Sequence, residues 1–379
     1  MGQQSLNGGT ATGNFAYASG LAAIATGEFA TATGVDSRAI GNCATAMGGH
    51  SHANGSCATA TGYSSLANGL QATATGAASD AIGENATATG ANSLANGDFA
   101  TAMGHNSNAN GTFATATGQD SYANGSSATA TGYSSLANGL QATATGSASD
   151  AIGQNATATG ADSFANGVSA TATGQNSIAN GATASAYGQG SNATGDATTA
   201  IGQASQATAT GATALGTGAT AAFTNSTAIG NGATTTAANQ ISLGTASNTY
   251  RMSGITSAAS RAAQSGPTSL VTTDANGNLA AAGFSGQDIS LLQSNVATLQ
   301  TQMRQSFEGT AIAIAMGGSA LPSDKKFAIS TNWGTFRGQN AMSLGAQMRL
   351  SEYVVVNGGV AAGFAQGGVG GRAGVTFAW

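Results

Sequence analysis

Side chains able to do metal or redox chemistry are few in this 379-residue sequence, which contains two cysteines and three histidines. Cys43 and Cys57 lie fourteen residues apart, at a position that holds phenylalanine in neighbouring segments. We expect them to be small buried side chains, with a disulfide between them as the alternative. His50, His52 and His105 have no ligand spacing with either cysteine, so the sequence predicts no metal site.

Acid–base and nucleophilic catalysis have equally little support. Only 6% of the residues are charged, and no Gly-x-Ser-x-Gly motif or phosphate loop stands between a predicted strand and a helix. Arg38 is the one basic residue before position 240, so the chain lacks the basic stripe that nucleic acid binding requires. We therefore expect a protein that is not an enzyme, without a cofactor and without a nucleic acid partner.

A glycine recurs at every seventh position from Gly13 to Gly202, and an alanine stands two residues before each one. Two half-repeats alternate, such as FATATG ending at Gly34 and SLANG ending at Gly97, so the true period is fourteen residues. This longer period continues to Gly244. A coiled coil is excluded, because each glycine costs a helix about 1 kcal/mol and no leucine seam accompanies the period.

The repeat instead predicts two short strands per coil, with alanine facing the interior and glycine at the bends. The bend glycines include Gly34, Gly62, Gly90, Gly118, Gly146, Gly174 and Gly202. Because an alanine core buries little apolar surface, we expect neighbouring chains to supply further contacts. Residues 57–97 recur almost unchanged at 127–167, and growth by duplication suits a display surface better than a catalytic cleft.

The C-terminal part of the chain changes pattern twice. Apolar residues spaced by three and four predict a short coiled-coil helix with the seam Ile289, Leu292, Val296, Leu299 and Met303. The last 55 residues then alternate apolar with small or polar side chains in four segments, as in a transmembrane β-barrel. Four strands cannot close a barrel, and eight would leave no room inside for helices. Twelve strands from three chains would leave that room, so we expect a trimer.

Contact with a bilayer is expected through strands alone. No apolar run approaches the roughly 20 residues of a membrane-spanning helix, and the longest covers residues 311–316. The N-terminal MGQQSLNGGT has neither the basic start nor the apolar core of a secretory leader. We therefore expect export to require a leader peptide that is missing from this chain.

The order of these parts resembles the trimeric autotransporter adhesins of the YadA-like family. The resemblance rests on the STAIG and ATATG repeats, the NQISLG segment, the short coiled coil and the C-terminus ending GVTFAW. It implies an all-β passenger, a left-handed parallel β-roll of 14-residue repeats, and four strands per chain in a twelve-stranded membrane β-barrel. The implied divisions are the head 1–238, neck 239–266, connector 267–284, coiled-coil stalk 285–306 and helix-plus-strands anchor 307–379.

The resemblance also implies that Val375, Phe377 and Trp379 form the terminal signal that barrel-assembly machinery recognises. The partners would be two further copies of the chain, outer-membrane lipid, and an unidentified ligand on host matrix or cell surfaces. We expect attachment to matrix, cells or surfaces, and self-aggregation, from the cell surface. Thr-x-Thr segments, as at 59–61 and 73–75, leave ice binding by flat threonine ladders as the alternative.

Overall fold

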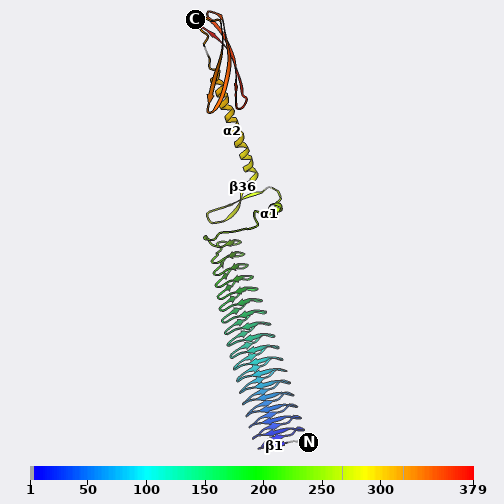
Figure 1. The fold of residues 1–379 in the computed structure, drawn as a ribbon. Helices are drawn as coiled ribbons and strands as arrows, with labels where there is room; N and C mark the ends of the chain where they lie inside the picture. Colours follow the sequence, from blue (N-terminus) through cyan, green and yellow to red (C-terminus); the bar gives the residue numbers. More distant parts are fainter. Residues whose placement is uncertain (1–3, 267, 319) are drawn as a thin grey trace. The chain divides into compact units, whose positions relative to one another are not determined.

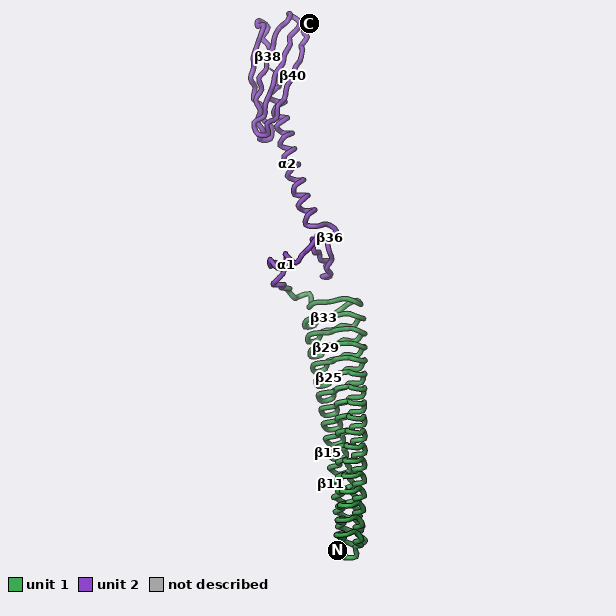
Figure 2. Tube along the Cα trace, turned by 90° about the vertical axis from the view of Figure 1, so that its right-hand side faces the viewer, with its two compact units in different colours: residues 1–250 green, residues 251–379 purple. Residues whose placement is uncertain are grey.

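The computed structural model describes residues 4–266, 268–318 and 320–379. The chain divides into two compact units, residues 1–250 and 251–379 (Figure 2). The predicted head and connector begin at residues 1 and 267, which lie outside the described residues. The five predicted divisions of the chain remain predictions.

The first unit is a parallel β-solenoid whose coils each contribute one strand to each of two sheets (Figure 1). One sheet has eighteen strands, and we call it the odd sheet because nearly all of them carry odd numbers. It begins with β1 (Gln4–Leu6) and ends with β34 (Ile241–Leu243). Between them, three-residue strands start every fourteen residues from β3 (Tyr17–Ser19) to β33 (Thr227–Ile229). The sixteen-stranded even sheet contains two-residue even-numbered strands starting every fourteen residues from β2 (Thr10–Ala11) to β32 (Thr220–Ala221). The predicted parallel β-roll is confirmed.

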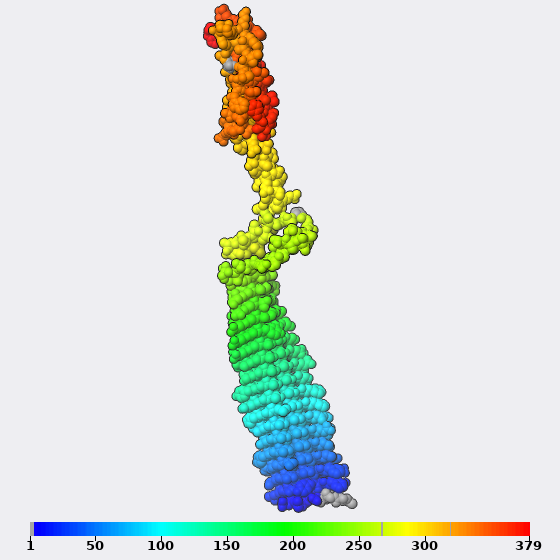
Figure 3. All heavy atoms as spheres, viewed as in Figure 1, coloured from blue at the N-terminus to red at the C-terminus, as the bar shows by residue number. Residues whose placement is uncertain are grey.

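Equivalent positions of successive coils pair with one another. Ala74 of β11 (Thr73–Thr75) pairs with Ala88 of β13 (Thr87–Thr89), and the threonines on either side pair in the same way. Each side chain therefore stands in a row of its equivalents, with about 4.8 Å between neighbours. Figure 3 shows the coils as regular layers along the first unit.

The interior of the roll is lined by alanine and serine. Every alanine two residues before a seventh-position glycine, from Ala18 to Ala200, is fully buried, which confirms that this position faces inward. Buried serines such as Ser37 and Ser51 donate a hydrogen bond from Oγ to the carbonyl oxygen three residues earlier, at 2.9 Å in both cases. Because all of these side chains are small, the two sheets lie close together and leave no room for a large residue.

The second unit contains two helices, one hairpin and one sheet among the residues described. The elements in chain order are α1 (Ala258–Ala263), β35 (Ser269–Thr273), β36 (Leu279–Ser285), α2 (Gly286–Ala315), β37 (Phe327–Phe336), β38 (Gln339–Ser351), β39 (Val354–Gly363) and β40 (Val369–Phe377). β35 and β36 pair as an antiparallel hairpin, and β37 to β40 form an antiparallel sheet in chain order. Within the described ranges, no helix has the length and apolar character needed to cross a membrane.

Helix α2 begins with a capping box. The Asp288 amide donates to Ser285 Oγ at 3.2 Å, and the Ser285 amide donates to the Asp288 carboxylate at 2.7 Å. The helix runs through the whole predicted seam and continues across Gly309 to Ala315. Its C-terminal turns pack on the sheet of β37 to β40, where Ala311, Ile312 and Ala315 are buried.

Candidate functional site

The sheet of β37 to β40 carries large apolar side chains on the face turned away from α2, which we call the outer face. Strand pairing sets these side chains beside one another, with Trp333 opposite Met342 and Leu344 opposite Val360. The full set, as grouped from the sequence, is Phe327, Ile329, Trp333, Met342, Leu344, Ala346, Met348, Leu350, Val354, Val356, Val360, Ala362, Phe364, Val369, Ala373, Val375, Phe377 and Trp379. Such a band, open to solvent in one chain, is typical of a surface that meets lipid.

The three residues of the predicted barrel-insertion signal lie at the C-terminal end of this outer face. Val375 pairs with Val356, and Phe377 pairs with Val354. The exposed fractions of Val375 and Phe377 are 52% and 67%, and Trp379 is fully exposed. All three side chains are therefore open to another protein.

The opposite, inner face of the sheet is flat enough to receive α2. A Cβ atom at Gly334 would collide with the backbone of Ala311 and Ala315, so glycine is required for this approach. Ser343 Oγ is buried there and donates to the carbonyl oxygen of Ala315 at 2.6 Å. Close backbone contact and a buried hydrogen bond together hold the helix to the sheet.

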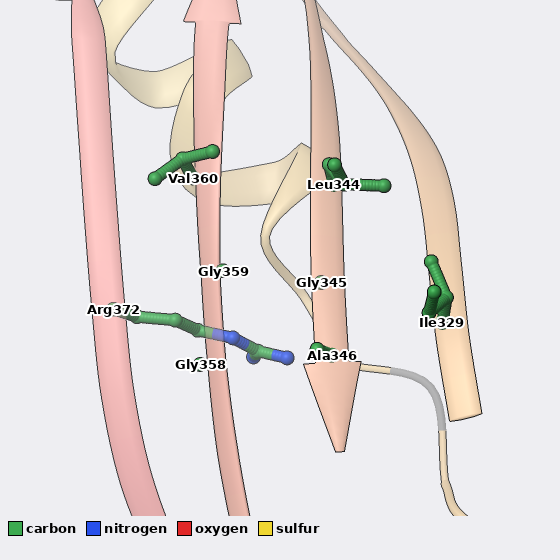
Figure 4. Close-up of a pocket in the computed structure, with 8 residues that line it drawn as sticks. All are labelled: Ile329, Leu344, Gly345, Ala346, Gly358, Gly359, Val360 and Arg372. Carbon is green, nitrogen blue, oxygen red and sulfur yellow. The ribbon is translucent and has the colours of Figure 1, made fainter. Parts of the chain in front are cut away.

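Elsewhere on the same sheet, Gly345, Gly358 and Gly359 border a shallow hollow beside the Arg372 side chain. Arg372 extends from β40 across Gly358 and Gly359 of β39 (Figure 4). A Cβ atom at Gly318, which follows α2, would lie 3.1 Å from the Arg372 guanidinium. The inner face thus combines small residues with polar side chains, unlike the apolar outer face.

Glu308 of α2 is the one buried acidic residue in the described part of the chain, with 1% of its surface exposed. Its carboxylate accepts hydrogen bonds from the backbone amides of Ala365 at 2.8 Å, Gln366 at 3.0 Å and Gly368 at 3.4 Å. These amides belong to the turn between β39 and β40, so Glu308 fastens that turn to the helix. No sequence pattern predicted this role for Glu308, although no other acidic residue stands between Asp288 and Asp324.

The predicted coiled-coil seam lies on the N-terminal half of α2. Its five residues, Ile289, Leu292, Val296, Leu299 and Met303, are between 39% and 62% exposed in the single chain. A row of apolar side chains at this spacing is available for contact with other helices.

The seven bend glycines follow odd-sheet strands, and their φ angles lie between 127° and 137°. They are Gly34, Gly62, Gly90, Gly118, Gly146, Gly174 and Gly202. Residues with a Cβ atom rarely adopt this conformation. A Cβ atom at Gly34 would also lie 2.5 Å from the carbonyl oxygen of Gly48 in the next coil. Both the backbone angle and the stacking distance therefore require glycine at this position.

The expectation that Cys43 and Cys57 are buried is wrong. Both are exposed free thiols, and the phenylalanines Phe15, Phe29, Phe99 and Phe113 at the same repeat position are between 48% and 58% exposed. All six have φ angles of 54° to 60°, because this position lies in the left-handed turn between the two sheets and points outward. Desolvation, the neighbouring Cys57 thiol and Glu28 raise the pKa of Cys43.

The remaining candidate residues lie on the surface of the roll. The first and third residues of the odd-sheet strands form two in-register rows of threonines, as Thr59 with Thr73 and Thr61 with Thr75. The row of Thr61 is interrupted by Met47, Met103 and Tyr187. Among the described residues, no group of three or more His, Cys, Asp or Glu side chains could hold a metal ion.

The geometry defines a solenoid head and, at the C-terminus, a sheet with an apolar outer face and a helix on its inner face.

Family models match both parts. A YadA-like membrane anchor domain matches residues 319–379. A YadA head domain repeat (2 copies) matches residues 18–42, 81–100, 95–121, 151–170, 172–191, 193–219, 207–233 and 224–247. The chain belongs to the YadA-like trimeric autotransporter adhesins.

Among the solved structures that are similar to this chain is the collagen-binding domain of the Yersinia adhesin YadA. The two chains are 26% identical over 45% of this chain and 72% of that chain, with a TM-score of 0.22. No curated protein sequence matches this chain.

Proposed function

We propose that three copies of this chain assemble in the outer membrane, where twelve strands form one barrel that exports the roll and then anchors it. The observation that carries this proposal is the two-faced sheet, with apolar side chains outside and α2 on the inner face. β37 and β40 are its two edges, and each leaves a row of backbone groups unpaired in the single chain. Joining the edges of three sheets satisfies those groups.

The number three follows from the position of α2. In an eight-stranded barrel the side chains alone fill the interior. Here each sheet already carries a helix on the face that becomes the interior, since Ala311 and Ala315 contact Gly334. Twelve strands enclose enough space for three helices.

Exposed apolar rows support association of the other segments. Near the C-terminal end of the roll, one row of the odd sheet consists of Tyr187, Ile201, Leu215, Ile229 and Leu243, each between 37% and 45% exposed. Burying such a row against further copies of the chain is favourable by about 25 cal/mol per Å² of apolar surface. The seam of α2 offers a second row of the same kind.

The remaining parts of the proposal concern what surrounds the trimer. The outer face of the barrel contacts outer-membrane lipid, and barrel-assembly machinery recognises Val375, Phe377 and Trp379. The head, held outside the cell, attaches to host matrix, cells or surfaces and to heads on other cells. Three identical heads raise avidity for any repetitive ligand.

Two experiments test the proposal. Deleting residues 1–244 while keeping the anchor displayed should abolish attachment to immobilised matrix proteins, with display measured by an antibody to an added epitope. Unchanged attachment contradicts the assignment of adhesion to the head. Unboiled full-length protein should migrate on a denaturing gel at three times the mass of one chain, and migration as a monomer contradicts the shared barrel.

The in-register threonine rows support ice binding as a second candidate. A flat array of hydroxyl groups can match ordered water, although Met47, Met103 and Tyr187 break the row. Thermal hysteresis measured on the full-length protein in detergent distinguishes the two functions, because an adhesin without ice affinity gives none.

A further inference from the structure

One hollow on the surface of the roll is lined by five titratable side chains, including two of the three histidines of the sequence. It has a volume of about 490 Å³, and its lining includes Asp36, His50, His52, Tyr63, Leu66 and Asp80. We call it the histidine hollow. Elsewhere the described surface of the roll consists mainly of threonine, alanine, asparagine and serine, so the hollow differs in chemistry from its surroundings.

The side chains of the hollow already constrain one another. The Asp36 carboxylate lies 3.4 Å from the Arg38 guanidinium and 3.3 Å from His50 Nδ1. The ring of His50 meets the ring of Tyr63 edge to face, with 5.5 Å between centroids. The aromatic wall and the polar groups are thus fixed in place before any ligand arrives.

The internal duplication reproduces only half of the hollow. Tyr133, Leu136 and Asp150 repeat Tyr63, Leu66 and Asp80 seventy residues later. The two preceding coils differ, because the equivalents of Asp36, Arg38, His50 and His52 are Asn106, Asn108, Asp120 and Tyr122. The chain therefore contains its own control site, with the same aromatic wall and without the histidines and the arginine.

We propose that the histidine hollow binds a neutral saccharide. A pyranose ring has an apolar C–H face, which fits the Tyr63 ring and Leu66, and a rim of hydroxyl groups that both donate and accept hydrogen bonds. The hollow supplies acceptors in Asp36 and Asp80 and donors in the histidines, and Arg38 beside it is paired with Asp36. A concave surface with a few placed polar groups beside apolar ones is typical of small-ligand sites.

Charge favours a neutral sugar over an acidic one. Arg38 is already paired with Asp36, so its charge is balanced in part before a ligand carboxylate arrives. Asp80 adds a second acidic group to the lining. An anionic sugar would meet this carboxyl without a compensating cation. The proposal rests on the proposed adhesive function and names one ligand class and one place on the head.

Cells displaying the full-length chain test the proposal on an array of neutral and sialylated glycans. Tyr63→Ala should weaken binding to neutral glycans by about tenfold, and Tyr133→Ala, the matched control, should leave it unchanged. Equal losses in both variants, no binding of the wild-type chain to any neutral glycan, or binding to sialylated glycans alone would each overturn the proposal. Heat-resistant trimers on gels show that each variant is folded.

Two deletions in whole repeats give a second test. Removing residues 35–62 takes out Asp36, Arg38, His50 and His52 in two complete coils, and should abolish glycan binding. Removing residues 63–132 takes out five coils but brings Tyr133 and Asp150 to the positions of Tyr63 and Asp80, and should preserve it. The reverse result contradicts the proposal. Matrix attachment is measured in the same cells to separate adhesion by the head from saccharide binding by the hollow. Adhesion that persists without any glycan binding overturns the saccharide site alone.

Discussion

Both glycines in each coil lie too close to the next coil to carry a Cβ atom, but only one of them also has a restricted backbone angle. Gly34 and its equivalents have φ angles near 130°, so an added Cβ would strain the backbone itself. Gly97 and its equivalents have ordinary φ angles, but an added Cβ would overlap the carbonyl oxygen of Gly111 in the next coil. The seven-residue period predicts both glycines at bends, because it does not distinguish torsional strain from stacking distance.

Gly97→Ala should therefore destabilise the roll by about 3 kcal/mol, through overpacking between coils. Gly218→Ala is the matched control, since its φ is 63° and no atom lies within 4 Å of its added Cβ. The same turn position already holds Ala78, Ala148 and Ala204, so this change should cost only about 1 kcal/mol. Denaturant unfolding of the full-length protein measures the difference, and equal losses would disprove the stacking argument.

Asp150 provides a prediction about pH. It pairs with Leu136 and Phe164 in the even sheet, and burial raises its pKa in the folded chain. The stability contributed by such a carboxyl is present below its ordinary pKa of 3.8 and is lost as the pH rises through the raised value. Asp150→Asn should therefore raise the melting temperature at pH 7. The gain should vanish below pH ~4, and a gain that is independent of pH would contradict this origin.

At the scale of elements, α2 joins two kinds of contact in one continuous helix. Its N-terminal half exposes the apolar seam, and its C-terminal half is buried on the sheet around Glu308. The apolar spacing predicted the first half. It could not predict the second, because Gly309 and the alanines that follow fit the sheet through their small size and not through a pattern of large apolar residues.

Glu308→Ala should weaken the anchor markedly. Three backbone amides of the β39–β40 turn would lose their acceptor, and leaving such groups unsatisfied costs about 3 kcal/mol. Glu352→Ala is the control, because Glu352 is exposed in the turn between β38 and β39. The temperature at which the trimer dissociates on a denaturing gel should fall for the first variant only, and equal temperatures would show that Glu308 is dispensable.

The four strands illustrate what the sequence does determine. Alternation with period two identified the outer-face residues from Phe327 to Trp379, because strand geometry sends successive side chains to opposite faces. The exposed turn position of Cys43 and Phe29 could not be found in this way. Cysteine and phenylalanine are usually buried, and only the backbone shows that this repeat position is a left-handed turn.

For the molecule as a whole, the fourteen-residue coil is the unit of change in the head. Deleting residues 63–132 removes seventy residues, so every remaining side chain keeps its row. The head should become about 24 Å shorter and remain folded and displayed, as measured by electron microscopy and surface labelling.

Deleting residues 63–125 is the matched control for this shortening. It removes four and a half coils and sets odd-sheet residues against even-sheet residues at the junction. That chain should be degraded or lose protease resistance at the junction. Equal resistance of the two deletions would show that strand register does not govern the roll.

Each coil pairs only with the coil before it and the coil after it, so a chain that crosses a membrane end first would gain folding free energy in nearly equal steps. A finished coil is wider than a single extended segment, so a coil closed outside would resist being drawn back through the proposed barrel. Each newly closed coil would then favour outward movement of the chain over return. Folding outside would perform mechanical work on the segment still inside, with no need for nucleotide hydrolysis.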